Sequence, residues 1–149
     1  IKKGADFVYF RRERTKKLSG TSHFVVDGVF AYTYPYSSDS TFSLGFQNFQ
    51  RKKYLAPAIF GREKANYYVN QTVIPPAFDT LSFNGAFSTK MSGLWRLKNE
   101  FLGGPFVSYS FLNKDQTKVI TIEAYLMALK FDKREYMKDL EGIIATFKE

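Results

Sequence analysis

The sequence contains no cysteine and a single histidine, His23, among its 149 residues. Without cysteine there is no disulfide scaffold and no cysteine-ligated metal or cluster, and one histidine leaves too few ligands for a zinc site. His23 directly follows Ser22, so on a strand the two side chains would point to opposite faces, which disfavours a serine–histidine catalytic pair. We therefore expect no metal, no cofactor and no catalytic triad.

Long apolar runs and acidic residues are also scarce. No apolar run approaches the ~18 residues of a membrane-spanning helix. Lys and Arg number 22 against 14 Asp and Glu, which gives a formal net charge of +8. Aromatic residues are abundant instead, with 16 Phe and 10 Tyr, and this content excludes a disordered chain. At ~150 residues per domain, we expect residues 1–149 to form a single domain.

Strand signals occupy most of the chain. Between Val29 and Tyr34, aromatic residues alternate with smaller ones, which predicts a pleated strand with one aromatic face. The preceding Asp27-Gly28 dipeptide allows either one long strand or a hairpin turn. Residues 80–100 contain one or two strands. The other strands are expected at 6–14, 23–34, 66–74, 106–112 and 118–129, with the last two paired as a hairpin.

Two segments have helical spacing. Phe42, Phe46 and Phe49 recur at i, i+4 and i+7 within residues 37–53. Residues 132–148 carry an apolar stripe at similar spacing, opposite a charged side and behind an aspartate suited to cap the helix. The element order predicts an α+β fold, a mainly antiparallel sheet of about five to seven strands with two flanking helices.

Four short motifs occur in order along the chain: Tyr32-Thr33-Tyr34-Pro35-Tyr36, Gly93-Leu94-Trp95-Arg96, Leu102-Gly103-Gly104-Pro105-Phe106-Val107-Ser108 and Lys133-Arg134-Glu135-Tyr136-Met137-Lys138-Asp139-Leu140-Glu141. Together they resemble the carboxyl-terminal half of a Bacteroidetes family of uncharacterised proteins, classed as a domain of unknown function and often predicted to be lipoproteins. The family usually has a proline after the strand at 119–127, where this chain has Met127-Ala128-Leu129. The element order is also similar to the Mog1/PsbP-like fold.

The resemblance implies a place for the chain within a longer protein. The chain would be its carboxyl-terminal part, and the other half would carry the signal and a lipid-anchoring cysteine. The location would be the cell envelope, in the periplasm or anchored to the outer membrane. No catalytic residues are established for the family, so none are carried over.

We expect a non-enzymatic binding role. The partner would be an envelope protein, a glycan, a lipid or the protein's own amino-terminal half, because the chain has folding signals throughout and no catalytic constellation. The residues expected at the binding surface come from the motifs above: Tyr36, Trp95, Arg96, Gly103, Gly104 and Phe106.

Two other functions stay open. Basic residues interleaved with aromatic ones near the amino terminus are typical of binding to nucleic acid or to an anionic surface; they are Arg11, Arg12, Arg14, Lys16 and Lys17. A carboxylate-based hydrolase would need two acids facing a cleft, for which Glu100 and Glu123 are the candidates. Alternation places Glu123 opposite Ile122 and Ala124, and we expect it to be a surface acid on a solvated face.

Two short segments are similar to the acceptor pattern for O-glycans on exported Bacteroidetes proteins. They are Asp39-Ser40-Thr41 and Asp79-Thr80-Leu81. Ser40 and Thr80 are therefore predicted modification sites, and a native mass without any addition would contradict this.

Overall fold

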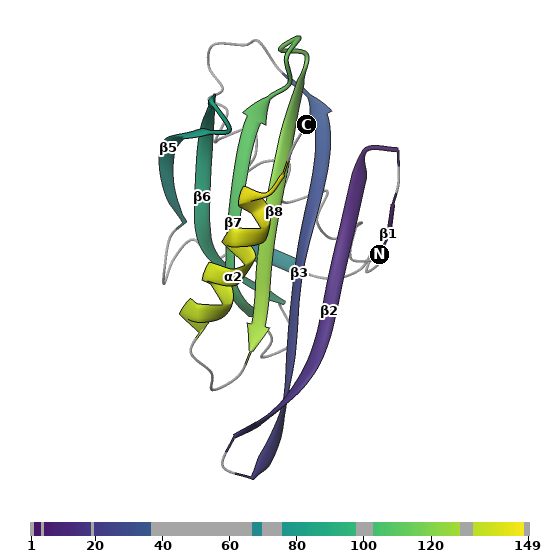
Figure 1. The fold of residues 1–149 in the computed structure, drawn as a ribbon, viewed down its shortest axis with the longest axis vertical. Coiled ribbons are helices and arrows are strands. Elements are labelled where there is room, and N and C mark those ends of the chain that lie inside the picture. The colour runs from purple at the N-terminus through teal and green to yellow at the C-terminus, as the bar shows by residue number, and fades with distance from the viewer. Residues whose placement is uncertain are drawn as a thin grey trace.

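The computed structural model describes residues 2–3, 5–18, 20–36, 67–69, 76–97, 103–128 and 133–147. These residues form one antiparallel sheet and one helix (Figure 1). The strands are β1 (Lys2–Lys3), β2 (Phe7–Leu18), β3 (Thr21–Pro35), β4 (Tyr67–Val69), β5 (Ala77–Phe83), β6 (Ala86–Leu97), β7 (Gly103–Leu112) and β8 (Lys118–Ala128), and the helix is α2 (Lys133–Ala145). Their order across the sheet is β1-β2-β3-β8-β7-β6-β4, and β5 also pairs with β6.

The expected α+β fold with two flanking helices is wrong for the described residues, and so is the Mog1/PsbP-like layout that it suggested. These residues contain one helix, α2, and otherwise form strands of a single sheet. The other expected helix rested on three phenylalanines within residues 37–53, which lie outside the described residues. In the described part of the chain, long runs rich in aromatic and β-branched residues extend into strands, as their packing on a pleated surface favours.

The β2–β3 hairpin is longer than the rest of the sheet. It turns at Gly20, whose φ of 78° suits glycine, and β3 then runs unbroken through the Asp27-Gly28 dipeptide. Pairing between β3 and β8 begins at Val25 with Ala128. The end of the hairpin therefore projects beyond β8 as a two-stranded ribbon, visible at the bottom of Figure 1.

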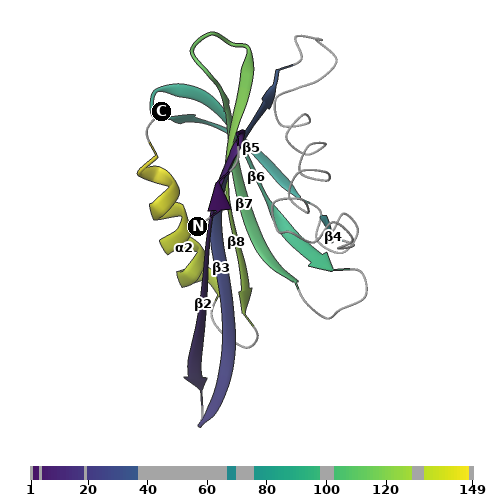
Figure 2. The same ribbon diagram turned by 90° about the vertical axis from the view of Figure 1, so that its right-hand side faces the viewer.

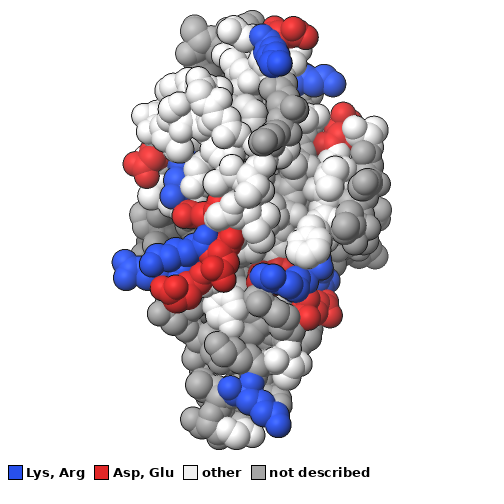
Figure 3. All heavy atoms as spheres, viewed as in Figure 1, with Lys and Arg blue, Asp and Glu red and all other residues white. Residues whose placement is uncertain are grey.

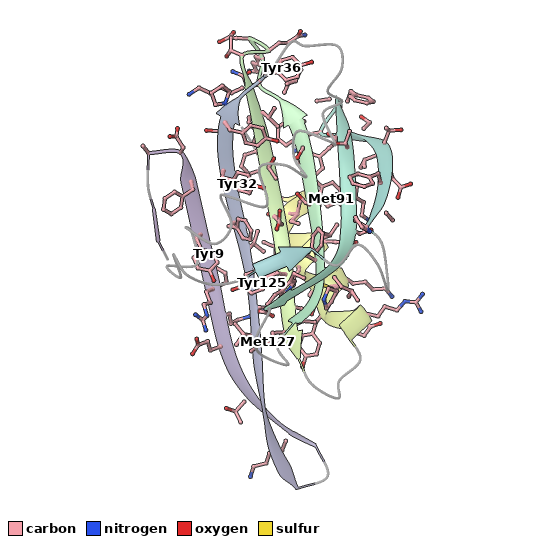
Figure 4. All side chains as sticks on the ribbon, turned by 180° about the vertical axis from the view of Figure 1, so that it is seen from behind. Tyr9, Tyr32, Tyr36, Met91, Tyr125 and Met127 are labelled. Atoms are coloured by element: carbon pink, nitrogen blue, oxygen red, sulfur yellow. The ribbon has the colours of Figure 1, made fainter. Side chains whose placement is uncertain are left out.

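The sheet has two chemically different faces. On the helix-side face, α2 packs Leu140 and Ile144 against side chains such as Ile122 and Leu126 of β8, and Figure 2 shows the helix lying along this side. The opposite face, here called the aromatic face, carries a core of large rings. Figure 4 shows its labelled tyrosines on β2, β3 and β8: Tyr9, Tyr32 and Tyr125.

Strand β8 lies in the middle of this arrangement and is buried on both faces. From Val119 to Leu126 every residue is buried, whether its side chain points to α2 or to the aromatic face. Both faces of this central strand therefore belong to the core, and the polar side chains between Val119 and Leu126 are buried.

Candidate functional site

Three of the six predicted binding residues lie together on the aromatic face. Trp95 on β6 and Phe106 on β7 are buried, and Gly104 pairs with Trp95 across the two strands. The indole meets the ring of Tyr125 edge-on, with the ring centroids 6.0 Å apart. Such contacts give Trp95 and Phe106 a packing role, and their use in binding stays a prediction.

Gly104 is required by a close approach of two strands. A Cβ atom built on it would lie 1.9 Å from the carbonyl oxygen of Leu126. Gly103 pairs with Arg96 at the next position, and the side chain of Arg96 lies outside the described residues. Tyr36 is half-buried against the same core, at the far end of β3 (Figure 4). The Gly-Gly-Pro motif thus begins strand β7.

Arg12 and Asp27 form an ion pair on the helix-side face. They lie opposite each other on β2 and β3, and Asp27 is only 1% exposed. The guanidinium donates from Nε to Oδ1 at 2.9 Å and from Nη2 to Oδ2 at 2.8 Å, the two-pronged geometry that binds carboxylates most strongly. The hydrogen bond to Asp27 raises the pKa of Arg12. The dipeptide that resembled a turn signal therefore supplies an ion-pair partner.

The five predicted basic residues do not share one surface. Neighbours on a strand alternate between faces, so Arg11 lies on the aromatic side and pairs with Glu13, while Arg12 lies on the helix side. Lys16 and Lys17 lie on the projecting ribbon, and Arg14 lies at its base, opposite Val25. Lys17 is exposed there, and the other two side chains lie outside the described residues.

Glu123 is buried, and the expectation of a surface acid is wrong. Its residue is 1% exposed on the aromatic face of β8, opposite Ser108 of β7. The hydroxyl of Tyr32 donates to its Oε2 at 3.5 Å. Alternation identifies which residues share a face, and it does not reveal whether water reaches that face. Glu100, the second candidate acid, lies outside the described residues.

A hydrogen bond between two phenols crosses the aromatic face. The hydroxyl oxygens of Tyr9 on β2 and Tyr125 on β8 are 2.5 Å apart. Burial raises the pKa of both phenols. The ring of Tyr125 passes over Gly28 of β3, where a Cβ atom would lie only 2.6 Å from Tyr125 Cε1. Gly28 therefore lets β8 reach β2 across the strand between them.

The helix leaves part of its own side of the sheet uncovered. Val8 and Phe10 of β2 alternate with buried Tyr9 and are 47% and 41% exposed, and Ile143 of α2 is 42% exposed. Tyr136 and Asp139, on the same stripe of α2 as Ile143, lie close enough to Arg12 of β2 to affect its pKa. We call these three exposed side chains, with the half-buried Val29 and Ala31 beside them on β3, the β2 surface.

On its other side α2 is held by charge. Lys90 of β6 pairs with Glu141 of the helix at 3.1 Å, and its ammonium lies 5.5 Å from the centre of the Tyr109 ring. Figure 3 shows blue and red side chains close together over the helix and over β2, with further charged side chains at the two ends of this face. Sequence reasoning missed the β2 surface, because residues 7–10 are apolar in both alternating sets and so predict core on both faces.

The predicted modification sites differ in what the structure shows. Thr80 is exposed on the outer strand β5, next to exposed Asp79, and Ser40 lies outside the described residues. Within the described ranges, no three His, Asp or Glu side chains gather as metal ligands. No helix in that part of the chain is long and apolar enough to cross a membrane.

Comparison with known proteins adds one finding. No curated protein matches the chain. The sequence profile described as "Domain of unknown function (DUF4837)" matches residues 1–146, which is nearly the whole chain and includes all four motifs of the sequence resemblance. The chain therefore belongs to the DUF4837 family.

Proposed function

We propose that this domain is a non-enzymatic binding module of the cell envelope, and that it binds through the β2 surface. The observation that carries the proposal is the position of Val8, Phe10 and Ile143, three exposed apolar side chains on the same side of α2. Contiguous exposed apolar groups commonly mark interaction sites. The Arg12–Asp27 ion pair at the edge of this surface would add polar specificity.

The dimensions of the sheet leave room for a partner. A helix is about 10 Å across and neighbouring strands are about 4.8 Å apart, so one helix covers about two strands. The helix α2 packs mainly over β8 and reaches β3 and β7, while β2 lies one strand further out (Figure 1). A second helix or an apolar segment would fit over β2 and β3 beside α2.

We assign this place to the amino-terminal half that the family resemblance predicts. Strand β1 brings the first residues of the chain alongside β2, at the same border of the sheet as the β2 surface (Figure 1). A polypeptide that precedes β1 would reach Val8 and Phe10 without crossing the sheet. Its docking would bury the apolar side chains that α2 leaves in water.

Thiol labelling of the full-length protein tests this docking, because the 149 residues contain no cysteine of their own. Phe10→Cys should react with a maleimide at least about tenfold more slowly in the full-length protein than in residues 1–149 alone. Phe78→Cys is the matched control, since Phe78 is also an exposed phenylalanine, on β5. Equal labelling of Phe10→Cys in both proteins would show that the preceding half does not cover the β2 surface.

The envelope location needs a separate experiment. Expressed in its source cells, the full-length protein should lose a leader and remain with the membrane fraction. Replacing the expected lipid-acceptor cysteine of the leader should release it into the soluble fraction. A protein found in the cytosol with its leader intact would refute the location and leave the docking experiment unaffected.

The projecting ribbon favours a second candidate, binding to nucleic acid. Arg11 and Arg12 are already paired with acids, whereas Lys17 is exposed on a ribbon that extends beyond β8. Binding of single-stranded nucleic acid should then weaken steeply with salt and should be reduced by Lys17→Glu. Binding that is absent at low salt, or unchanged by that substitution, would eliminate this candidate.

A further inference from the structure

A pocket of about 1070 Å³ lies at the end of the sheet opposite the projecting ribbon. Three segments that are distant in sequence form it: the β5–β6 turn, the β7–β8 turn and the carboxyl end of α2. These segments meet near the top of Figure 1. Its volume slightly exceeds the roughly 300–1,000 Å³ that is typical of cavities holding small organic ligands.

The pocket is lined on one side by aromatic rings. Phe83 of β5 stacks on Phe111 of β7 with ring centroids 5.5 Å apart, and Phe111 meets Phe147 at 6.1 Å. Phe87 of β6 also lines the pocket and is 66% exposed, more than any other large apolar side chain of the described residues. A phenyl ring held in water beside buried rings favours a ligand with an apolar body.

Hydrogen bonds hold the three segments in place. The side-chain amide of Asn84 donates from Nδ2 to the carbonyl oxygen of Phe147 at 2.6 Å, which ties the β5–β6 turn to the end of α2. Asn113 Oδ1 accepts from the backbone amides of Thr117 and Lys118, both at 2.9 Å. The pocket is therefore largely preformed, which lowers the entropic cost of binding.

The polar groups left over for a ligand are few. Among the described residues that line the pocket, Lys114 is the one with a charged side chain, and no hydrogen bond or ion pair to another described residue engages it. Gln116 lies beside it with a φ of 55°, a left-handed conformation uncommon for a residue with a Cβ atom. Such conformations cluster at ligand sites. The described lining of the pocket thus combines an apolar aromatic wall with one available cation.

We propose that this pocket binds a small amphipathic monoanion, a molecule with an apolar body and one carboxylate, as in a medium-chain fatty acid. The apolar body lies against Phe87 and the aromatic wall, and the carboxylate faces Lys114. The inference is independent of the function proposed for the β2 surface, because the two regions share no residue.

Titration calorimetry with dodecanoate below its micellar concentration tests the proposal on the 149-residue protein. We expect saturable binding to one site per chain. Dodecyltrimethylammonium, with the same tail length and the opposite charge, should bind at least about tenfold more weakly because it meets Lys114. No saturable binding of dodecanoate up to about 1 mM, or equal binding of the two probes, would overturn the proposal.

Two variants and two matched controls locate the site. Lys114→Glu and Phe87→Ser should each weaken dodecanoate binding about tenfold, and Lys114→Glu should strengthen binding of the cationic probe. Lys17→Glu and Phe78→Ser make the same chemical changes at exposed positions outside the pocket, and should leave both affinities unchanged. Equal losses in variants and controls would show nonspecific adsorption and refute the site.

Discussion

The central strand β8 and the border strand β2 contain similar apolar residues, but these residues are buried in β8 and partly exposed in β2. In β8 every side chain from Val119 to Leu126 is buried, so polar groups such as Glu123 sit inside the core. In β2 the same apolar alternation buries Tyr9 and leaves Val8 and Phe10 exposed, because one helix covers only part of the face. The position of a strand in the sheet, more than its composition, decides whether an apolar side chain becomes core or surface.

If the centre is as tightly packed as this comparison requires, one added methyl group there should be very costly. We expect Gly104→Ala to destabilise the domain by at least about 3 kcal/mol, because its Cβ would overlap the carbonyl oxygen of Leu126 in the neighbouring strand. Urea unfolding followed by circular dichroism measures the change. A loss below about 1 kcal/mol would show that β7 and β8 can separate, and that the centre is less rigid than its geometry indicates.

The ion pair between β2 and β3 marks the boundary between the two regions. Asp27→Asn should lower the free energy of unfolding by about 2 kcal/mol. The substitution leaves the Arg12 guanidinium without its charged partner, next to the buried side chain at position 27. The Arg12–Asp27 pair is partly exposed on the arginine side, which keeps the cost below that of a fully buried pair.

The matched control for Asp27→Asn is Glu13→Gln, which removes the exposed partner of Arg11. It should cost less than about 0.5 kcal/mol, as exposed ion pairs usually do. Urea unfolding of both variants under one set of conditions gives the comparison. Similar losses would mean that burial of Asp27 adds nothing to the strength of its ion pair.

The hydrogen-bonded phenols of Tyr9 and Tyr125 connect the border strand β2 to the central strand β8. Stability should therefore depend on pH in the range where tyrosine titrates. Burial raises the pKa of Tyr125 above its usual value, so above pH ~10 the unfolded chain loses a proton that the native state keeps. The free energy of unfolding should therefore fall as pH rises above ~10, by up to about 1.4 kcal/mol per pH unit for one tyrosine. Tyr125→Phe should make this fall less steep than in the wild type.

Urea unfolding of both proteins at a series of pH values tests this slope. The comparison between variant and wild type removes the contribution of the lysines, which also titrate in this range. At neutral pH, Tyr125→Phe should cost about 1 kcal/mol, because Tyr9 loses its hydrogen-bond partner. Parallel slopes above pH ~10 would contradict the burial of the Tyr125 phenol.

The sequence predicted local features well where one strand or helix determines them. The alternation of residues 29–34 and the amphipathic stripe of residues 132–148 both correspond to elements of the structure. Features that depend on a second strand were missed. The Asp27-Gly28 dipeptide resembled a turn signal, because Arg12 and Tyr125, which these two residues accommodate, lie on strands distant in sequence.

The candidate sites likewise depend on contacts between segments that are distant in sequence. Burial of Glu123 depends on both faces of β8 being covered, and exposure of Phe10 depends on where α2 ends its coverage. The pocket at Phe87 joins two turns to the end of a helix. Each is a property of three or more segments, which alternation within one segment cannot reveal.

A small stabilising effect is expected on the solvent-exposed side of α2. Gly142 is exposed in the last turn of the helix, and apart from the adjacent backbone of the helix itself no atom lies within 4 Å of a Cβ atom built on it. Gly142→Ala should therefore stabilise the domain by about 0.5–1 kcal/mol, because alanine loses less backbone entropy in a helix.

Gly20 provides the instructive contrast to Gly142. It is equally open, and yet Gly20→Ala should destabilise by about 1 kcal/mol, because its φ of 78° strains any residue with a Cβ atom. Thermal unfolding of both variants measures the two signs. If both substitutions stabilise the domain, the free space around each glycine alone determines the change in stability. Opposite signs would show that backbone conformation determines the change even where nothing touches the new methyl group.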